Sequence, residues 1–500
     1  MNNLKFILII LLFLNPLVFW GQRNKLNIAH LGAKGDGKSD NTLIIQKAID
    51  NASAGGNGIV IVPAGKFMIG VIHLKSNIEL HLDENAFLLG SPKRSDYGPK
   101  DASPLIVADH QHNISITGKG IIDGQGDQLI KDIYWMLNAG TLEDTEWKVY
   151  NPWHQMRPEE RNRPKIIELT DCDTLHIKGI TIKNGLCWIQ NYKNSSNITI
   201  DSIKVESNTF WNNDGIDITD CKNVRITNCQ INCDDDGICL KSYDPKKRCE
   251  NIYVANCSVR ASASAVKLGT ASKGGFKNIT IRDITVYDTF RSAIAIESVD
   301  GGILEDVEVR NITAKNTGNA IFIRLGHRNI DSVYSQLRHI HISNIKAEIP
   351  LTKPDKGYPM EGPEPDFAHN VFPSSISGIP GHEIEDVTLK NIELIYQGGG
   401  KNSIASLPVD SLSKIPEQIS EYPEFSMFGE LPSWGFYARH VKGLKLENIT
   451  IKVKEKDYRP AFVLDDIKRL YMNKLIIEAK DTRKQIYLNN ISKSGVNIWK

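Results

Sequence analysis

Two short acidic phrases contain the residues of this sequence that are best suited to chemistry. Asp214 lies in Asn212-Asn213-Asp214-Gly215, and Asp235 and Asp236 lie in Asp234-Asp235-Asp236-Gly237. Carboxylates held close together repel one another, so at least one should have a raised pKa and stay protonated while the others stay ionised. A protonated acid for a leaving oxygen and a carboxylate base for a water are the groups that hydrolysis of a glycosidic bond requires.

Two other interpretations of these acids remain open from the residues alone. Asp and Asn are common in tight turns, where their side chains bond the local backbone. Clustered carboxylates also suit calcium, which takes oxygen ligands. An isolated Asp fits the turn interpretation, whereas three consecutive acids close to one repeat away from Asp214 favour catalysis. We therefore predict catalytic aspartates, with no metal and no cofactor.

The acids are embedded in a repeat that runs along the chain. Phrases with alternating apolar residues begin at Asn197, Asn223, Asn251 and Asn278, at spacings of 26, 28 and 27 residues. A fixed period in this range indicates a solenoid, and short strands without an amphipathic helix exclude leucine-rich and ankyrin-type arrays. A propeller is the second choice, but its blades need about 40 residues. The predicted fold class is therefore all-β: a single-stranded right-handed parallel β-helix, whose coils pair with those above and below.

The period predicts the surroundings of the acids. Asp214 and Asp235 are 235 − 214 = 21 residues apart, which would place them on neighbouring coils of the same face. Long insertions break the period at 127–163, 347–383 and 397–437. Such insertions usually project on one face of a solenoid and often build its binding site. The first and third insertions could therefore wall off a groove, which would favour attack at the ends of a polysaccharide chain.

The N-terminal part of the chain carries two further signals. Residues 1–21 are predicted to be a signal peptide, because Lys5 precedes an apolar run too short to span a bilayer. Residues 22–500 would then form one β-helix domain of a secreted or periplasmic protein, with no membrane span after cleavage. Ser39-Asp40 is expected to cap a short helix over the open end of the core. That helix would carry Ile44, Ile45, Ala48 and Ile49.

Charge and cysteine content limit the class of partner. Lys plus Arg total 60 against 59 for Asp plus Glu, so no global field favours nucleic acid or an anionic membrane. The expected partner is a polysaccharide or oligosaccharide bound at a local site, and the protein is expected to be a monomer. All eight cysteines lie between positions 172 and 257 without a C-x-x-C pattern. We interpret them as stacked small core residues.

Two groups of motifs connect the chain with a known family. Residues 32–37, 62–66 and 118–126 are similar to the N-terminal coils of one family, and the first two phrases also occur in other pectin-lyase-like β-helices. More specific are residues 212–217, similar to an Asn-Thr-Asp motif, and 235–242, similar to an Asp-Asp motif. With these motifs, most of the mature chain resembles glycoside hydrolase family 28, the polygalacturonases and related pectin hydrolases.

The resemblance implies a role for each acid. Asp235 would be the general acid, and Asp214 and Asp236 would activate the attacking water. The family inverts anomeric configuration, which implies an acid–base separation of roughly 6.5–9.5 Å with room for that water. Direct stacking of Asp214 on Asp235 would give a shorter gap, so their side chains must diverge.

The chain departs from the family at its substrate-binding motifs. Where a Gly-His-Gly motif is expected, the chain reads Ala263-Ser264-Ala265, and Ala295-Ile296-Glu297 replaces Arg-Ile-Lys. That Arg and Lys would hold a substrate carboxylate through charge-assisted bonds, whereas Glu297 would repel it. Lys267, Arg291, Arg324 or Arg328 could supply a positive group instead. The predicted substrate-binding residues are Asn212, Trp188, Gln190, Lys241, Lys267, Arg291, Glu297 and Arg324.

Three functions follow, in order of preference. The first is an inverting glycoside hydrolase of polygalacturonase type, acting on a pectic or related acidic polysaccharide. The second is a polysaccharide lyase on the same fold, which needs an Arg or Lys base and calcium, and which would release an unsaturated sugar. The third is a non-catalytic glycan-binding β-helix, which would be favoured if Asp235→Asn left every activity unchanged.

Overall fold

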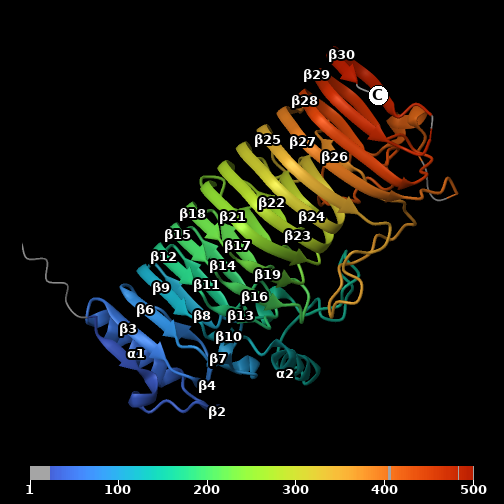
Figure 1. The fold of residues 1–500 in the computed structure, drawn as a ribbon. Coiled ribbons are helices and arrows are strands. Elements are labelled where there is room, and N and C mark those ends of the chain that lie inside the picture. The colour runs from blue at the N-terminus through green and yellow to red at the C-terminus, as the bar shows by residue number, and fades with distance from the viewer. Residues whose placement is uncertain (1–22, 404–406, 482, 499–500) are drawn as a thin grey trace, which may run out of the picture.

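The computed structural model describes residues 23–403, 407–481 and 483–498, and it shows an elongated solenoid (Figure 1). Throughout these residues the named strands belong to one continuous sheet that winds through successive coils. Each strand pairs in parallel with the equivalent strand of the next coil, as β14 does with β17 and β17 with β20. The predicted all-β parallel β-helix is therefore confirmed.

One column of stacked strands positions the acidic phrases. Its central members are short, whereas later strands are longer and bend round the corners of their coils. In order along the solenoid, the column contains β11 (Ile167–Thr170), β14 (Gln190–Lys193), β17 (Ile216–Thr219), β20 (Ile238–Ser242), β22 (Val266–Ser272), β23 (Gly275–Ser298), β24 (Ile303–Leu325), β26 (Ser374–Ser377), β28 (Phe436–Glu455) and β29 (Phe462–Glu478).

The repeated asparagines form a ladder at one corner of the coils. Asn223 donates to Asn197 at 3.1 Å, Asn251 donates to Asn223 at 3.0 Å, and Asn278 donates to Asn251 at 2.7 Å. Each has a φ between 55° and 58°. Asn tolerates this left-handed conformation better than most residues, so the turn requires it and the ladder satisfies its amide.

The interior of the solenoid is apolar. In the strands that follow each ladder asparagine, Ile198 stacks on Val224 and Ile200 stacks on Ile226 of the next coil, and all four are buried. Full burial of an aliphatic side chain of this size contributes about 1.5–3 kcal/mol. The eight cysteines are buried and unpaired among the described residues, as their interpretation as core residues requires.

A helix covers the N-terminal end of the core. Helix α1 (Thr42–Ala54) packs against β3 (Gly58–Val62) and buries Ile45, Ala48 and Ile49, while Ile44 is half-buried. The capping helix is thus confirmed, but its N-cap is Asn41 and not Ser39-Asp40. The Asp40 carboxylate still accepts the backbone N–H of Thr42 at 2.9 Å.

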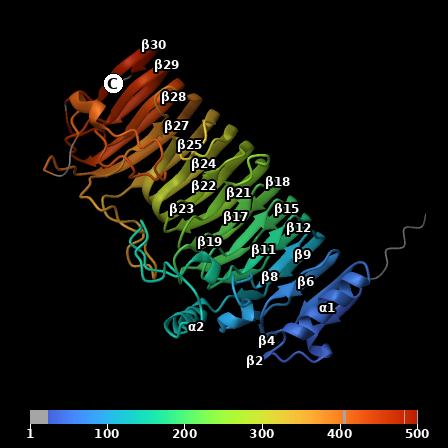
Figure 2. The same ribbon diagram turned by 180° about the vertical axis from the view of Figure 1, so that it is seen from behind.

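The three insertions project on one side of the solenoid (Figures 1 and 2). The first contains helix α2 (Gly126–Asn138) and joins β10 (Ile121–Asp123) to β11. The second is shorter than predicted, because β25 (Gln336–Ile349) and β26 belong to regular coils and leave only residues 350–373. The third spans residues 399–435, between β27 (Ile384–Gly398) and β28.

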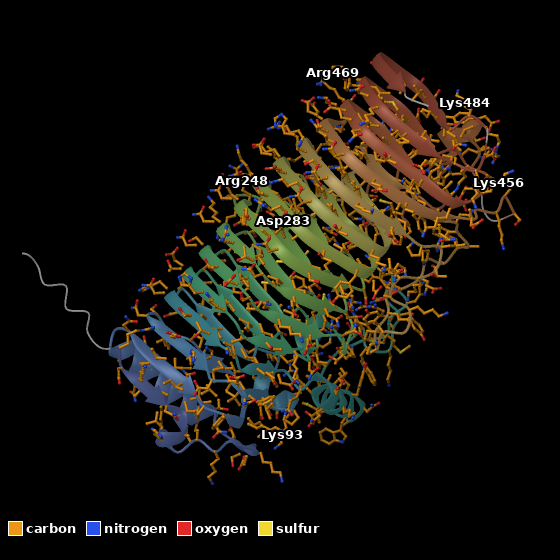
Figure 3. All side chains as sticks on the ribbon, in the orientation of Figure 1. Lys93, Arg248, Asp283, Lys456, Arg469 and Lys484 are labelled. Carbon is orange, nitrogen blue, oxygen red and sulfur yellow. The ribbon has the colours of Figure 1, made fainter. Side chains whose placement is uncertain are left out.

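Charged side chains cover the outside of the coils, as Lys456, Arg469 and Lys484 show in Figure 3. The mixture of both signs agrees with the absence of a strong net charge. No helix within the described ranges is long and apolar enough to cross a membrane. The predicted signal peptide lies outside the described residues.

The coils are stacked tightly at Gly118. Its φ is +112°, and a Cβ placed there would lie 1.9 Å from the carbonyl oxygen of Leu82 on the previous coil. We expect Gly118→Ala to lower the free energy of unfolding by about 2–5 kcal/mol, from backbone strain and overpacking together. Gly56→Ala is the control, because Gly56 also has a positive φ but no atom within 4 Å of the added Cβ. Denaturant unfolding of both variants gives the comparison, and equal losses would contradict this interpretation.

Candidate active site

The register of the column determines which acids are neighbours. Ile216 of β17 pairs with Ile238 of β20, an offset of 22 residues. Asp214 therefore aligns with Asp236, and the backbone N–H of Gly215 donates to the carbonyl of Asp236 at 2.9 Å. The prediction that Asp214 stacks on Asp235 was wrong by one residue. Asp235 aligns instead with Asn213, whose carbonyl accepts its N–H at 3.4 Å.

The acids open into a cleft of about 270 Å³ on the side of the solenoid that carries the insertions. The aspartates Asp214, Asp235 and Asp236 line it together with five predicted binding residues: Asn212, Trp188, Lys241, Lys267 and Arg291. A polar cleft of this size can enclose about one to two sugar units, which suits a site that binds the end of a glycan.

Asp214 and Asp236 face each other closely enough to share a water. An oxygen of each lies within 4.8 Å of an oxygen of the other. The buried Oδ1 of Asp214 has no hydrogen-bond partner among the described residues. A water between the carboxylates of Asp214 and Asp236 can donate a hydrogen bond to each. It would also satisfy the buried oxygen of Asp214, which is costly to leave without a partner. The arrangement therefore provides a site for an activated water.

Asp236 is held as a carboxylate. Its side chain accepts the backbone N–H of Ser264 at 3.0 Å and lies 3.1 Å from the ammonium of Lys267. Burial alone would raise the pKa of Asp236, but Lys267 and Lys241 outweigh burial and lower it below its usual value. Asp236 is therefore ionised at mildly acidic pH and can accept a proton.

The pKa of Asp235 is shifted in the opposite direction. Its side chain is half-buried, whereas those of Asp214 and Asp236 are buried. Burial and the neighbouring negative charge of Asp236 raise the pKa of Asp235 above its usual value, against the attraction of Arg291 and Lys267. The pKa values of these two adjacent carboxyls are thus shifted in opposite directions.

Asp214 belongs to a buried ionic group. The Lys241 ammonium donates to Asp214 at 2.7 Å and also bonds Asp217, which is fully buried. Burial raises the pKa of Asp214 well above its usual range despite Lys241, and it raises that of Asp217 to about 6. Lys241 stays charged, because both carboxylates favour the ammonium. Asp236, not Asp214, is consequently the carboxylate most readily ionised.

The charges of the carboxylates and lysines in this site compensate one another. Oxygen atoms of Asp214 and Asp236 cluster with the sulfur of Cys239, a grouping that could hold a metal ion in principle. However, the Lys241 and Lys267 ammonium groups contact the same two carboxylates. A divalent ion there would be repelled by two buried cations, so the donor set does not suit a metal.

Cationic side chains surround the acids. Arg157, Lys267, Arg291 and Arg328 line the cleft, and Arg291 lies 3.4 Å from Glu424 of the third insertion. Arg328 is fixed by two hydrogen bonds of 2.9 Å to Asp300. The cleft therefore contains positive groups although the chain lacks the family's Arg and Lys.

Three predicted binding residues do not line the cleft. Gln190 is fully buried, and its side chain bonds Tyr192 and the carbonyl of Gly215 inside the core. Glu297 lies behind Lys267 at 3.9 Å and accepts Thr270 Oγ1 at 3.0 Å. Arg324 points under the third insertion and donates to the carbonyl groups of residues 417 and 418. Strand alternation in the sequence does not show which polar side chains turn inward.

Trp188 is directly below Asp214, as the backbone N–H of Ile189 donates to the carbonyl of Asp214 at 2.9 Å. Its ring centroid lies 3.7 Å from the Lys241 ammonium. This cation–π contact helps to keep Lys241 charged. Asn212 is half-buried and accepts a hydrogen bond from Arg163 at 3.2 Å, which fixes the turn that carries Asp214.

The insertions contact each other above the cleft. The Trp153 ring of the first insertion and the Tyr422 ring of the third lie 5.4 Å apart at 80°. Tyr422 also bonds Lys267 at 3.0 Å, and His154 lies 2.9 Å from Asp366 of the second insertion. All three insertions therefore meet beside the acids, and both Trp153 and Tyr422 line the cleft.

Sequence reasoning missed several residues of the site. Arg157 and Tyr422 lie in insertions without a repeat, so no register predicts their position. Asp217 carried a usable signal, because it is a charged residue between Ile216 and Ile218 in a buried strand. A buried acid in such a strand needs a cation, and this requirement points to Lys241.

Comparisons with known proteins agree with this site. The family model described as "Glycosyl hydrolases family 28" matches residues 53–351. The exo-poly-alpha-D-galacturonosidase of Dickeya chrysanthemi is 28% identical over 346 residues, which span 60% of this chain and 57% of that relative. A Zea mays exopolygalacturonase is 26% identical over 74% of this chain and 77% of its own length. The Thermotoga maritima exopolygalacturonase structure has the same fold, with a TM-score of 0.58 at 24% identity over 75% of this chain and 87% of its own.

Proposed function

Because the chain belongs to glycosyl hydrolases family 28, we propose that it is an inverting glycosidase that removes sugars from the ends of an acidic, pectic polysaccharide. One observation carries the proposal: adjacent carboxyls in one cleft have opposite pKa shifts, raised for Asp235 and lowered for Asp236. This is the acid and base pair that single-step hydrolysis needs.

In the proposed reaction, protonated Asp235 gives its proton to the glycosidic oxygen as the bond to the anomeric carbon breaks. A water held between Asp214 and Asp236 forms the new bond to that carbon, and Asp236 takes its proton. Asp214 orients the water, since its raised pKa leaves it less ionised than Asp236 and so less available to take the proton. Acid and base are separate groups in this scheme, as the single displacement of an inverting enzyme requires.

The cations of the cleft support an acidic sugar. Arg157, Lys267, Arg291 and Arg328 all line it, and guanidinium groups bind carboxylates through paired hydrogen bonds. The relatives from Dickeya and maize are named for galacturonan hydrolysis. Glu297, which the sequence placed as a repelling group, lies behind Lys267 and accepts a hydrogen bond from Thr270. It therefore does not oppose a uronate.

Attack at chain ends is supported by the contact between Trp153 and Tyr422. These rings join the first and third insertions beside the acids, and we propose that their contact restricts the path of a glycan through the cleft. We expect the double variant Trp153→Ala, Tyr422→Ala to release longer oligosaccharides early in the reaction, because internal bonds gain access. Chromatography of the first products from a polysaccharide would detect this change.

Tyr471→Ala is the matched control for that variant. Tyr471 is an exposed aromatic residue of β29, far along the solenoid from the cleft. Its removal should leave single sugars as the first products. If the double variant also releases only single sugars, the contact between the insertions does not determine the mode of attack.

The direct test of the proposed function is a screen of purified protein against pectic, rhamnogalacturonan and algal glycans. Chromatography of released sugars should identify a saturated acidic monosaccharide from one of them. Product that absorbs as an unsaturated sugar would instead establish a lyase. Release of no sugar from any glycan would favour a non-catalytic binding protein.

We also propose that the protein is exported and acts as a monomer. Residues 1–21 carry the signal-peptide pattern, and the eight cysteines need no disulfide partner in another chain, because all are buried. N-terminal sequencing of the exported protein should begin near Gln22, and light scattering should give the mass of a single chain.

A further inference from the structure

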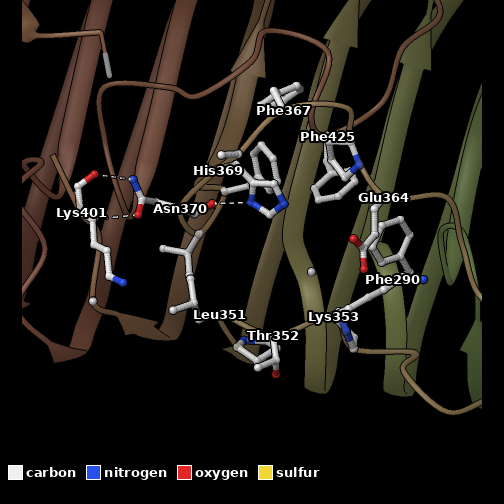
Figure 4. Close-up of a pocket in the computed structure, with 18 residues that line it drawn as sticks. Phe290, Leu351, Thr352, Lys353, Glu364, Phe367, His369, Asn370, Lys401 and Phe425 are labelled. Atoms are coloured by element: carbon white, nitrogen blue, oxygen red, sulfur yellow. Dashed lines mark hydrogen bonds between the residues drawn. The ribbon is translucent and has the colours of Figure 1, made fainter. Parts of the chain in front are cut away.

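A second cavity lies beside the cleft and takes no part in the proposed reaction. It has a volume of about 420 Å³ and lies where the second and third insertions meet β23 and β24 (Figure 4). Four phenylalanines line it, one from the β-helix and three from the insertions: Phe290, Phe367, Phe372 and Phe425. Apolar cavities of this size with a few polar groups are typical small-molecule sites.

The aromatic wall of this cavity is fixed by its own contacts. The ring of Phe425 lies 4.8 Å from that of Phe372 and 5.8 Å from that of Phe290, both steeply inclined. Phe367 lies 6.3 Å from Phe372 at 85° and is only half-buried, so it borders the opening. A planar aromatic ligand would extend this edge-to-face arrangement.

Asn370 joins the two insertions behind the aromatic wall. Its side-chain amide donates to Glu430 at 2.6 Å, and its side-chain oxygen accepts the backbone N–H of Lys401 at 2.9 Å. Figure 4 shows the hydrogen bonds that Asn370 makes beside the cavity. The cavity is therefore formed before a ligand enters, which reduces the entropy lost on binding.

Charges around the cavity are balanced. The Lys353 ammonium lies 2.9 Å from Glu361 and 3.6 Å from Asp355. Lys401 and Glu364 carry opposite charges and both line the cavity. These five groups are two cations and three acids, so the cavity has no net positive charge to attract a carboxylate, and a neutral ligand fits better than a free acid.

One polar group in the cavity can recognise a hydroxyl. His369 Nδ1 is 2.9 Å from the carbonyl oxygen of Asn370, so this nitrogen is the donor. Nε2 of the neutral ring is then an acceptor. A phenolic hydroxyl is a donor at the edge of an aromatic ring, and it matches that acceptor.

The cavity and the cleft are connected by shared lining residues. A hollow of about 210 Å³ between them is lined by Trp153 and Pro363, which also line the cleft. The same hollow shares Glu364, Pro365 and Phe367 with the aromatic cavity. A glycan bound in the cleft can therefore extend past Trp153 toward the phenylalanines.

We propose that this cavity binds a neutral phenolic ester substituent of the glycan whose end occupies the cleft. This inference rests on the proposed function for its glycan, but the cavity itself contains no residue of the proposed acid and base pair. Binding and hydrolysis can therefore fail separately.

Titration calorimetry with methyl ferulate, a neutral phenolic ester, tests the proposal. We expect saturable binding to the wild-type chain, binding weakened about tenfold or more by Phe367→Ala, and binding unchanged by Phe87→Ala. Phe87 is a half-buried phenylalanine of β7 (Ala86–Gly90), near the N-terminal end of the solenoid. Ala368→Trp is a second test, because it fills the cavity from an exposed position without removing a core residue.

Three results would overturn the proposal: no binding to the wild-type chain, tighter binding of the free acid ferulate than of the ester, or full affinity in both cavity variants. Asp235→Asn separates this proposal from the proposed function. That variant should bind methyl ferulate normally, even though its hydrolysis of glycans is strongly reduced. If the wild-type chain also lacks hydrolysis but binds the ester, only the proposed function fails.

Discussion

Asp235→Asn should lower kcat by about 10²–10⁴-fold while KM changes little, because it removes the proton donor and keeps the shape of the side chain. The effect should be largest for substrates with poor leaving groups, which depend most on protonation. Initial rates on the glycan identified by screening give the measurement. Asp109→Asn, at an exposed carboxylate of β8 (Ile106–Asp109), is the matched control and should retain full activity.

The pH profile of the same variant gives an independent check. In the wild type, activity should fall as pH rises through the raised pKa of Asp235, which then loses its proton. It should also fall as pH drops through the lowered pKa of Asp236, below the usual value of 3.8. The residual activity of Asp235→Asn should lack the alkaline decline. An unchanged alkaline decline would show that another group is the acid.

Lys267→Met should give the second large effect. Lys267 is the main attraction that keeps Asp236 ionised, so its loss should raise the pKa of Asp236 and shift the acidic decline of activity to higher pH. Activity at acidic pH should therefore fall most. The buried carboxylates of Asp236 and Glu297 also lose their shared cation, which should cost about 3–5 kcal/mol of unfolding free energy.

Two further variants separate charge from packing at this position. Lys267→Arg keeps the positive charge, so the acidic decline should stay at the wild-type pH. Burial raises the pKa of Glu297 to about 7, so adding Glu297→Gln to Lys267→Met should restore part of the stability only above that pH, and should not restore the pH profile. Stability contributed by ionised Asp236 is present above pH 3.8 and is lost as pH falls through its lowered pKa. An acidic decline that stays in place in Lys267→Met would contradict the role of Lys267.

The fold could be predicted from the sequence because each coil needs the same kind of residue at the same corner. A residue that tolerates positive φ recurs at one corner, so Asn197, Asn223 and Asn251 mark the period directly. Alternating isoleucines then show which side faces the core. Insertions lack both signals, so their positions could be predicted only approximately. The second insertion was predicted too long because β26, with its serines, does not show the apolar pattern.

The site was predictable only where it belongs to the repeat. Asp214, Asp235 and Asp236 stood out by type and spacing, but a coil of 22 instead of 21 residues changed which of them are neighbours. Gln190 and Glu297 were misplaced because the direction of a polar side chain depends on its buried partners, Tyr192 and Thr270. Tyr422 is brought to the cleft by tertiary packing of an insertion, which no local pattern encodes.

Proton NMR of the first sugar released by the wild-type enzyme tests the central claim most directly. The account predicts a saturated sugar whose anomeric configuration is opposite to that of the bond cleaved, because water attacks from the side of Asp236 while Asp235 protonates the leaving oxygen. Retention of configuration, or an unsaturated product, would contradict it.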